Sequence, residues 1–264
     1  MGIFRIVLLL CLFWPALGAA QGVEVGQPSS LRNLVPAKEI EQESAKQYGQ
    51  LLRQAATKGA LAPDDHPQVI RLRAIARRLV VEAPRFNPAA RDWRWEVNLV
   101  GSKQINAFCM PGGKIAVYTG LLLGLKLSDD EAAMVMGHEI AHALREHARE
   151  RLAKTQLTRL GASLLGEFLG GGRFSDAFQI GGGLLTLKFS RDDETEADLV
   201  GLELAARAGY NPRAGISLWH KMNEANRSAP PQWLSTHPAS RNRIAEIERQ
   251  MPRVLPLYDE ARRG

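Results

Sequence analysis

The sequence predicts an α+β fold that is mainly helical, with one small antiparallel sheet. Apolar residues recur at helical spacing in several long segments, whereas the alternation typical of strands is confined to residues 94–119. No internal repeat is visible, and the composition, 45% hydrophobic and 23% charged, is that of a globular protein. The formal net charge of +6 is dispersed along the chain, so no nucleic-acid partner is expected, whereas peripheral contact with an anionic membrane surface is compatible with it.

Residues 1–20 differ from the rest of the chain. Arg5 is followed by an apolar run, Ile6–Trp14, and then by small residues up to Ala20. This order predicts a signal peptide that is cleaved after Ala20, with an uncleaved membrane anchor as the alternative. Cleavage would leave Cys109 as the only cysteine, which excludes an internal disulfide and favours a small packed side chain over a thiolate ligand.

The expected elements follow in order from the periodicity and the capping residues. Helices are predicted at 36–59 and 66–83, a strand at 94–102 and a hairpin over 105–122 that turns at 111–113. A further helix is predicted from 129 to about 153 and starts with the capping-box pair Ser128 and Glu131. Three more helices are expected: at about 193–208, after Asn211-Pro212, and after Thr236-His237-Pro238. The expected organisation is a lead-in and helix (21–64), a catalytic domain (65–252) and a C-terminal tail (253–264), with the glycine-rich segment 161–189 as a mobile flap or a plain surface excursion.

The helix predicted at 129–153 contains the motif His138-Glu139-Ile140-Ala141-His142. Two histidines four residues apart differ by about 40° around a helix, so both imidazoles can reach one cation. Glu139 is placed to polarise a metal-bound water, which is the arrangement of zinc peptidases. If the helix continues, His147 lies about 180° from His138 and points away from the metal.

A catalytic zinc site needs a third protein ligand, and acids cluster at residues 190–209. On a helix, Glu194, Ala197, Asp198, Gly201 and Ala205 form one stripe of mostly small residues that would pack against the metal helix. Glu194 can then be the ligand, and Asp198 can accept a hydrogen bond from a ligand histidine. An acidic helix N-terminus with no metal is an equally good interpretation of the spacing alone.

With these motifs in place, the sequence resembles the zinc metallopeptidases that include the CAAX prenyl endopeptidase and the bacterial protease HtpX. That family pairs H-E-x-x-H with a downstream E-x-x-A-D, which here is Glu194-Thr195-Glu196-Ala197-Asp198. The segments Asn106–Leu122 and Ser235–Ile244 are also similar, so the resemblance covers about residues 65–250. It implies a zincin-like domain of the gluzincin type, with one Zn²⁺ per chain bound by His138, His142 and Glu194.

The resemblance also implies a function. The exported single-domain form looks like periplasmic family members of Gram-negative bacteria, which degrade misfolded or misassembled envelope proteins. The expected activity is that of a zinc endopeptidase with Glu139 as general base. The alternatives are a chaperone-like protein that holds such substrates with little proteolysis, and a domain in which the metal is structural.

Other site residues are expected from position and residue type. His237 could donate to the developing oxyanion, serve as a fourth ligand, or only cap a helix, and Tyr118 and Tyr210 are weaker candidates for the donor. The strand at 115–119, with Ile115 and Val117, could offer its edge to an extended substrate, although an ordinary internal hairpin is the alternative.

Overall fold

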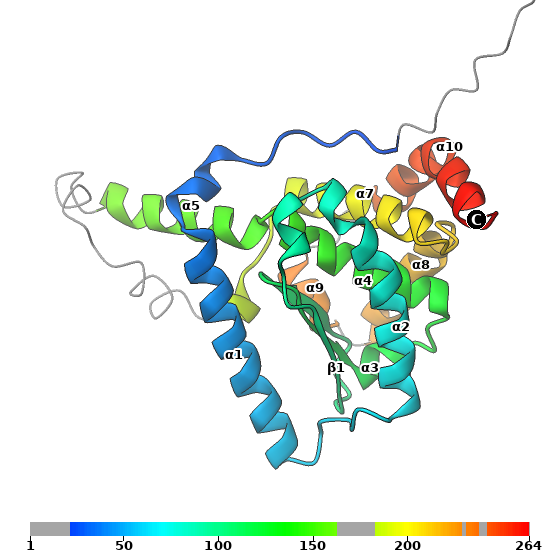
Figure 1. The fold of residues 1–264 in the computed structure, drawn as a ribbon, viewed down its shortest axis with the longest axis horizontal. Coiled ribbons are helices and arrows are strands. Elements are labelled where there is room, and N and C mark those ends of the chain that lie inside the picture. The colour runs from blue at the N-terminus through cyan, green and yellow to red at the C-terminus, as the bar shows by residue number, and fades with distance from the viewer. Residues whose placement is uncertain (1–21, 163–182, 229–230, 238–241, 264) are drawn as a thin grey trace, which may run out of the picture.

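The computed structural model describes residues 22–162, 183–228, 231–237 and 242–263. The expected signal peptide, and residues 163–182 of the expected flap, lie outside this range. Helices surround one small sheet, with α1 (Ala37–Thr57) and α2 (Pro67–Glu82) on its two sides (Figure 1). The prediction of a mainly helical α+β fold is confirmed.

The sheet has three strands in the order β1-β3-β2, and it is mixed. β2 (Ala107–Met110) and β3 (Lys114–Tyr118) form the expected antiparallel hairpin, and the positive φ angles of Gly112 (79°) and Gly113 (81°) form its turn. β1 (Glu96–Val100) pairs with β3 in parallel, so the prediction of a purely antiparallel sheet is wrong. β3 is therefore the middle strand and β2 is an edge.

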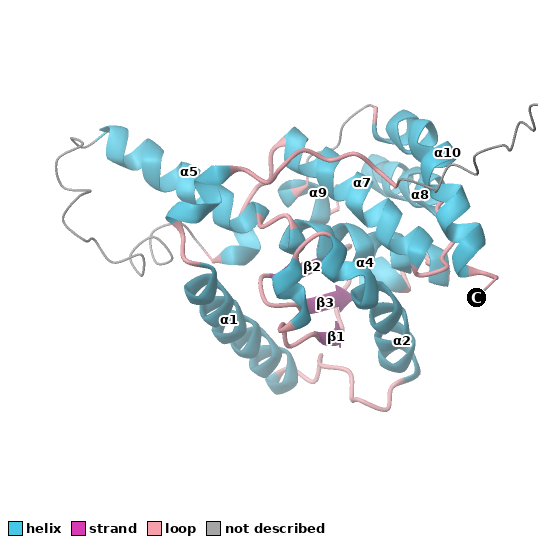
Figure 2. Cartoon of the chain, turned by 45° about the horizontal axis from the view of Figure 1, so that its top comes forward, coloured by secondary structure: helices cyan, strands magenta, loops and turns pink. Residues whose placement is uncertain are grey.

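The remaining helices pack around the sheet and against one another (Figure 2). The longer ones are α4 (Asp129–Leu144), α5 (His147–Ala162), α7 (Arg191–Arg207), α8 (Ala214–Ser228) and α10 (Arg243–Ala261), and the short ones are α3 (Thr119–Leu122) and α9 (Trp233–Thr236). Turns of 3₁₀ helix lie at Ser30–Leu34, Ala83–Arg85, Pro88–Arg91 and Leu184–Thr186. No helix in the described part of the chain is both long and apolar enough to cross a membrane.

Helix α4 is the centre of the core. It packs against β2, α2, α7 and α8, and every residue from Glu131 to Leu144 is buried. It packs most closely against α7, because glycines of both helices meet where the two cross. A Cβ atom on Gly201 would lie 2.6 Å from the backbone nitrogen of His138, and a Cβ atom on Gly137 would lie 2.8 Å from the Gly201 carbonyl oxygen. The stripe of small residues expected on α7 therefore faces the helix that carries the HExxH motif.

Two helix boundaries differ from the sequence expectation. The helix predicted at 129–153 is broken: α4 ends at Leu144 with Arg145 as its C-cap, Glu146 has a φ of 59°, and α5 starts in a new direction at His147. The expected C-terminal tail is mostly the second half of α10, where Val254 and Leu257 are buried in the main core.

Candidate metal centre and active site

Helix α4 positions the HExxH motif because its start is well fixed. The Ser128 hydroxyl accepts from the Glu131 backbone nitrogen, and the Glu131 carboxylate accepts from the Ser128 backbone nitrogen, which is the predicted capping box. Glu131 also accepts from Lys221, so the N-terminal end of α4 is tied to α8. His138, Glu139 and His142 follow two to four turns later, in the buried part of the helix.

Four side chains bring donor atoms to one point: His138 and His142 from α4, Glu194 from α7, and His237 just after α9. All four are buried, and one donor atom of each lies within 4.8 Å of the others. The His138 Nε2 atom is 3.1 Å from His142 Nε2 and 3.3 Å from His237 Nδ1. Glu194 Oε1 is 3.3 Å from His142 Nε2 and 3.0 Å from His237 Nδ1.

This donor set fits a zinc ion. Ligands held tetrahedrally at about 2.0–2.1 Å from a metal lie about 3.3 Å from one another. The distances that His138 and Glu194 make to the other donors and to each other are 3.0–3.6 Å, and all four donor atoms lie within 4.8 Å of one another. His138 and His142 each place the Nδ1 atom against an outer partner, so both Nε2 lone pairs face the same point. A cation between these lone pairs and the Glu194 carboxylate would stabilise the arrangement.

The charges around Glu194 keep it ionised. Burial alone would raise the pKa of this carboxyl, but hydrogen bonds from His142 and His237 outweigh burial and lower the pKa. Burial also lowers the pKa of His142 well below its usual value, which favours the neutral imidazole that a metal needs.

The outer nitrogen of His138 is held by the residue expected for it. His138 Nδ1 lies 3.0 Å from Asp198 Oδ1, and Asp198 comes one turn after Glu194 on α7. Arg243, at the start of α10, donates from Nε to Asp198 Oδ2 at 2.6 Å and from Nη1 to Glu194 Oε2 at 2.7 Å. Arg243 is buried and stacks on the Trp219 ring, with its Cζ atom 3.9 Å from the ring centroid. Sequence reasoning missed Arg243, although it lies in Ser235–Ile244, a segment that is similar to the family.

The outer nitrogen of His142 contacts a residue that was expected to point away. Because the helix breaks at Arg145 and Glu146, His147 is buried with its Nδ1 atom 2.9 Å from His142 Nδ1. Its Nε2 atom lies 3.3 Å from Glu196 Oε2, which also accepts from Arg145 Nε at 2.8 Å. Burial raises the pKa of Glu196, but the hydrogen bonds from His147 and Arg145 outweigh it and lower the pKa to about 2.

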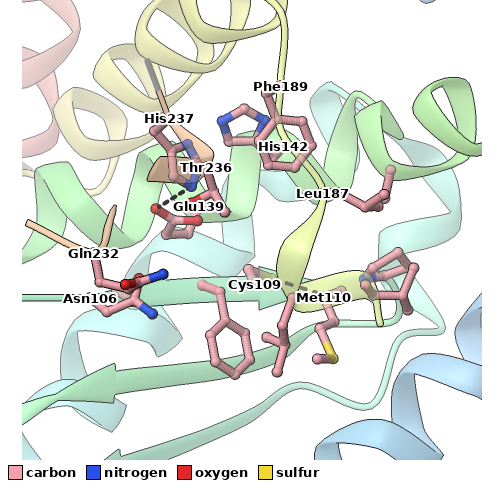
Figure 3. A pocket seen from close by; sticks show the side chains of 16 residues that line it. Asn106, Cys109, Met110, Glu139, His142, Leu187, Phe189, Gln232, Thr236 and His237 are labelled. Atoms are coloured by element: carbon pink, nitrogen blue, oxygen red, sulfur yellow. Dashed lines mark hydrogen bonds and ion pairs between the residues drawn. The ribbon is translucent and has the colours of Figure 1, made fainter. Parts of the chain in front are cut away.

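Glu139 lines the pocket beside these donors (Figure 3). Trp233 Nε1 donates to Glu139 Oε1 at 2.5 Å, and His237 Nε2 lies 3.7 Å from the same oxygen. Both of these contacts are made to Oε1. Burial opposes protonation of His237, but the charges of Glu139 and Glu194 outweigh it and raise the pKa of His237.

The sequence predicted a helix that starts near His237, and the structure shows instead that His237 follows the end of one. Its backbone N–H donates to the Trp233 carbonyl at the C-terminal end of α9, and α10 starts only at Arg243. Residues 238–241 lie outside the described range. Tyr118 and Tyr210 do not line this pocket; Tyr210 instead lies under Arg78, with the Arg78 Cζ atom 4.3 Å from its ring centroid.

The expected substrate edge at Ile115 and Val117 is absent, because β3 has a strand on each side. The edge strand at this pocket is β2, whose residues Ala107 and Cys109 are buried. The Tyr118 backbone nitrogen donates to the Asn106 carbonyl and the Gly113 nitrogen to the Met110 carbonyl, so even-numbered residues of β2 face β3. The backbone groups of Ala107 and Cys109 therefore point away from the sheet, and both residues line the pocket with Glu139.

The pocket is nearly filled by the segment that precedes α7. Leu184, Leu185 and Leu187 line it, and the Phe189 ring stacks on His142 with 4.0 Å between the ring centroids. The Phe189 backbone nitrogen donates to the Thr236 carbonyl, which ties this segment to the loop that carries His237. The remaining volume is about 60 Å³, less than half of the roughly 150 Å³ of a cavity that admits benzene. A side chain as large as a benzene ring can enter only if these residues move.

The model of peptidase family M48 matches residues 68–251, which is more than half of the 264-residue chain. The chain belongs to peptidase family M48. This membership confirms the resemblance drawn from the HExxH and ExxAD motifs and the expectation of a metallopeptidase at the level of the family.

Curated relatives agree with the family. Mitochondrial metalloendopeptidase OMA1 of Arabidopsis thaliana is 38% identical over 173 residues, or 64% of this chain and 35% of that protein. The protein of the same name from Saccharomyces cerevisiae is 31% identical over 226 residues, or 81% of this chain and 64% of that protein. The beta-barrel assembly-enhancing protease of Escherichia coli is 30% identical over 177 residues, or 60% of this chain and 35% of that protein. The chain thus spans 35% to 64% of the length of these relatives.

These relatives correct the expected location. The plant and yeast relatives are named as mitochondrial proteins, and the bacterial relative is less similar to this chain than either. The prediction of a periplasmic protein of a Gram-negative bacterium is therefore wrong by this comparison. The signal peptide expected at residues 1–20 stays a prediction, because those residues lie outside the described range.

Proposed function

We propose that this protein is an endopeptidase that uses one Zn²⁺ per chain to hydrolyse peptide bonds in unfolded or misassembled proteins. The observation that carries the proposal is the convergence of four buried donor atoms, two of which belong to His142 and His237 and line, together with Glu139, a pocket bordered by a strand edge. A metal that only stabilises the fold does not need a carboxylate that follows its first histidine ligand and lines a pocket. Family membership supports the same chemistry.

In this proposal each residue of the site has one task. His138, His142 and Glu194 hold the metal, which when bound lowers the pKa of a water ligand towards about 7. Glu139 accepts the proton of the attacking water on its carboxylate and delivers it to the leaving amine. The Trp233 hydrogen bond to Oε1 holds that carboxylate in position and leaves Oε2 for the proton.

The position of His237 supports one of its three expected roles. Its Nδ1 atom belongs to the donor cluster, so in the geometry described it fits a fourth ligand that closes the site. A role as oxyanion donor requires the ring to leave the cluster, and the Thr236–Phe189 hydrogen bond links such a movement to the segment that fills the pocket.

We further propose that an extended substrate pairs with the outward backbone groups of Ala107 and Cys109 on β2. These groups lie on the pocket side of an edge strand, where main-chain pairing accepts many sequences. Replacing Ala107 with proline removes one outward N–H, so we expect a higher KM with a smaller change in kcat. An unchanged KM in a folded Ala107→Pro protein would rule out this edge.

The main test is the zinc content and the casein cleavage of the purified protein, compared with those of Glu139→Gln. The variant should bind the same amount of zinc and lose about 10²–10⁴-fold of the cleavage rate, because only the proton acceptor is removed. Glu248→Gln, at an exposed position of α10, is the matched control and should cleave normally.

The possible results separate the functions. Full cleavage by Glu139→Gln would exclude the general-base mechanism. A zinc-loaded wild-type protein that prevents aggregation of unfolded proteins and cuts none of them would favour the chaperone-like alternative. If cleavage is confirmed, the inactive Glu139→Gln protein can be used to trap natural substrates in cells.

A further inference from the structure

The turn between α4 and α5 brings an unexpected histidine to the metal centre. In a continuous helix, His147 would point away from His138 by about 180°. Instead the positive φ of Glu146 redirects the chain, and His147 is buried against the outer nitrogen of His142. The turn is stabilised by Arg145, which donates to Glu196 and to the Gly26 carbonyl.

The hydrogen bonds of this group define where each proton lies. The Glu196 carboxylate only accepts hydrogen bonds, so the proton of His147 lies on Nε2, which is 3.3 Å from Glu196 Oε2. His147 Nδ1 then has a lone pair and accepts from His142 Nδ1–H at 2.9 Å. The Nε2 atom of His142 is left unprotonated on the side of Glu194 and His138. That tautomer is the one a metal ligand needs.

We propose that His147 and Glu196 are positioning residues that hold His142 in its metal-binding tautomer and ring orientation. The inference rests on the proposed metal site, and it adds residues that the HExxH and ExxAD motifs do not assign. Glu196 acts through His147, and Arg145 holds the Glu196 carboxylate in place. His147 holds the edge of the His142 ring through the hydrogen bond to Nδ1, and Phe189 stacks on the face of the same ring. The two contacts together fix the orientation of the ring.

The zinc dissociation constant of the folded protein tests this proposal by chelator competition. His147→Leu removes the acceptor for His142 Nδ1–H, and we expect the dissociation constant to rise about 10–100-fold. His147→Asn places an amide oxygen at the position of the Nδ1 atom, where it can accept the same hydrogen bond, so it should recover most of the affinity. The control is His220→Leu, the same substitution at an exposed position of α8, which should leave the affinity unchanged.

A second measurement reads the tautomer directly. Nitrogen-15 correlation spectra of the histidine rings in the zinc-loaded protein should show His142 protonated on Nδ1, and the signal of that proton should shift or broaden in His147→Leu. A purely structural role for His147 would lower the thermal stability of the metal-free protein and leave both the zinc affinity and this signal unchanged.

The results distinguish this inference from the proposed function. If wild type binds no zinc, the proposed function fails, and the inference that depends on it also fails. If wild type binds zinc and folded His147→Leu and Glu196→Leu bind it equally well, the proposed function stands and the positioning role is overturned. Should His147→Leu fail to fold, the zinc affinity of folded Glu196→Leu and the nitrogen-15 spectrum of the wild-type protein decide the question.

Discussion

Each histidine of the HExxH motif has its outer nitrogen held by a supporting unit that contains a carboxylate and an arginine. The two units differ in how the carboxylate reaches the histidine. At His138, Asp198 accepts directly from Nδ1 and Arg243 binds the carboxylate. At His142, His147 stands between the ligand and Glu196, and Arg145 binds that carboxylate.

The environments of the two units also differ. The Asp198 and Arg243 side chains are 7% and 4% exposed, whereas Glu196 is 30% exposed. Arg243 also binds Glu194, so one guanidinium contacts both the proposed ligand Glu194 and Asp198, which holds the proposed ligand His138. A buried charge that loses its partner is far more costly than an exposed one. The unit at His138 should therefore be the more sensitive to substitution.

Arg243→Leu should have the largest effect. It leaves Asp198 and Glu194 buried without their cation, so the free energy of unfolding of the metal-free protein should fall by about 3–5 kcal/mol in urea titrations. Zinc should reduce this loss, because the metal would balance the charge of Glu194. The matched control is Arg249→Leu on the same helix, where the arginine is 66% exposed and pairs only with Glu246 among the described residues. Equal stability losses in the two variants would refute the distinction drawn here.

Sequence reasoning anticipated the unit at His138 because it depends on regular helices. The phase of residues 194–205 placed Glu194, Asp198 and Gly201 on one stripe, and the structure packs that stripe on α4. Arg243 was not anticipated, since its partners lie 45 and 49 residues earlier in the chain and no local pattern connects them.

The unit at His142 could not be anticipated because it depends on a break in a helix. Residues 143–151 contain no glycine or proline, so the periodicity predicted one continuous helix. The turn is stabilised by distant contacts instead, because Arg145 reaches Gly26 and Glu146 pairs with Arg32. Glu146 also makes a local pair with Arg149. Strand order in the sheet escaped prediction for the same reason, since alternation marks a strand and does not identify its partner.

Asp198→Asn should have the next largest effect, and it sharpens the comparison at the level of metal binding. The amide oxygen can still accept from His138, but the charge that Arg243 requires is lost inside the protein. We expect the zinc dissociation constant to rise about 10–100-fold. Chelator competition measures this change, and circular dichroism of the metal-free variant checks that it folds. A dissociation constant within twofold of wild type would show that Asp198 does not position His138.

Glu196→Gln should have the smallest effect of the three. One oxygen of Glu196 accepts from both His147 and Arg145, and a glutamine oxygen can take the same place while the lost charge is partly replaced by water. We therefore expect the zinc dissociation constant to rise less than about tenfold, below the effect of Asp198→Asn, because a partly exposed charge contributes less than a buried one. Glu196→Leu removes the acceptor as well and should approach the effect of His147→Leu. If Glu196→Gln instead weakens zinc binding more than Asp198→Asn, exposure does not determine which unit is more sensitive to substitution. The unit of His147 and Glu196 would then be the more sensitive support of the metal centre.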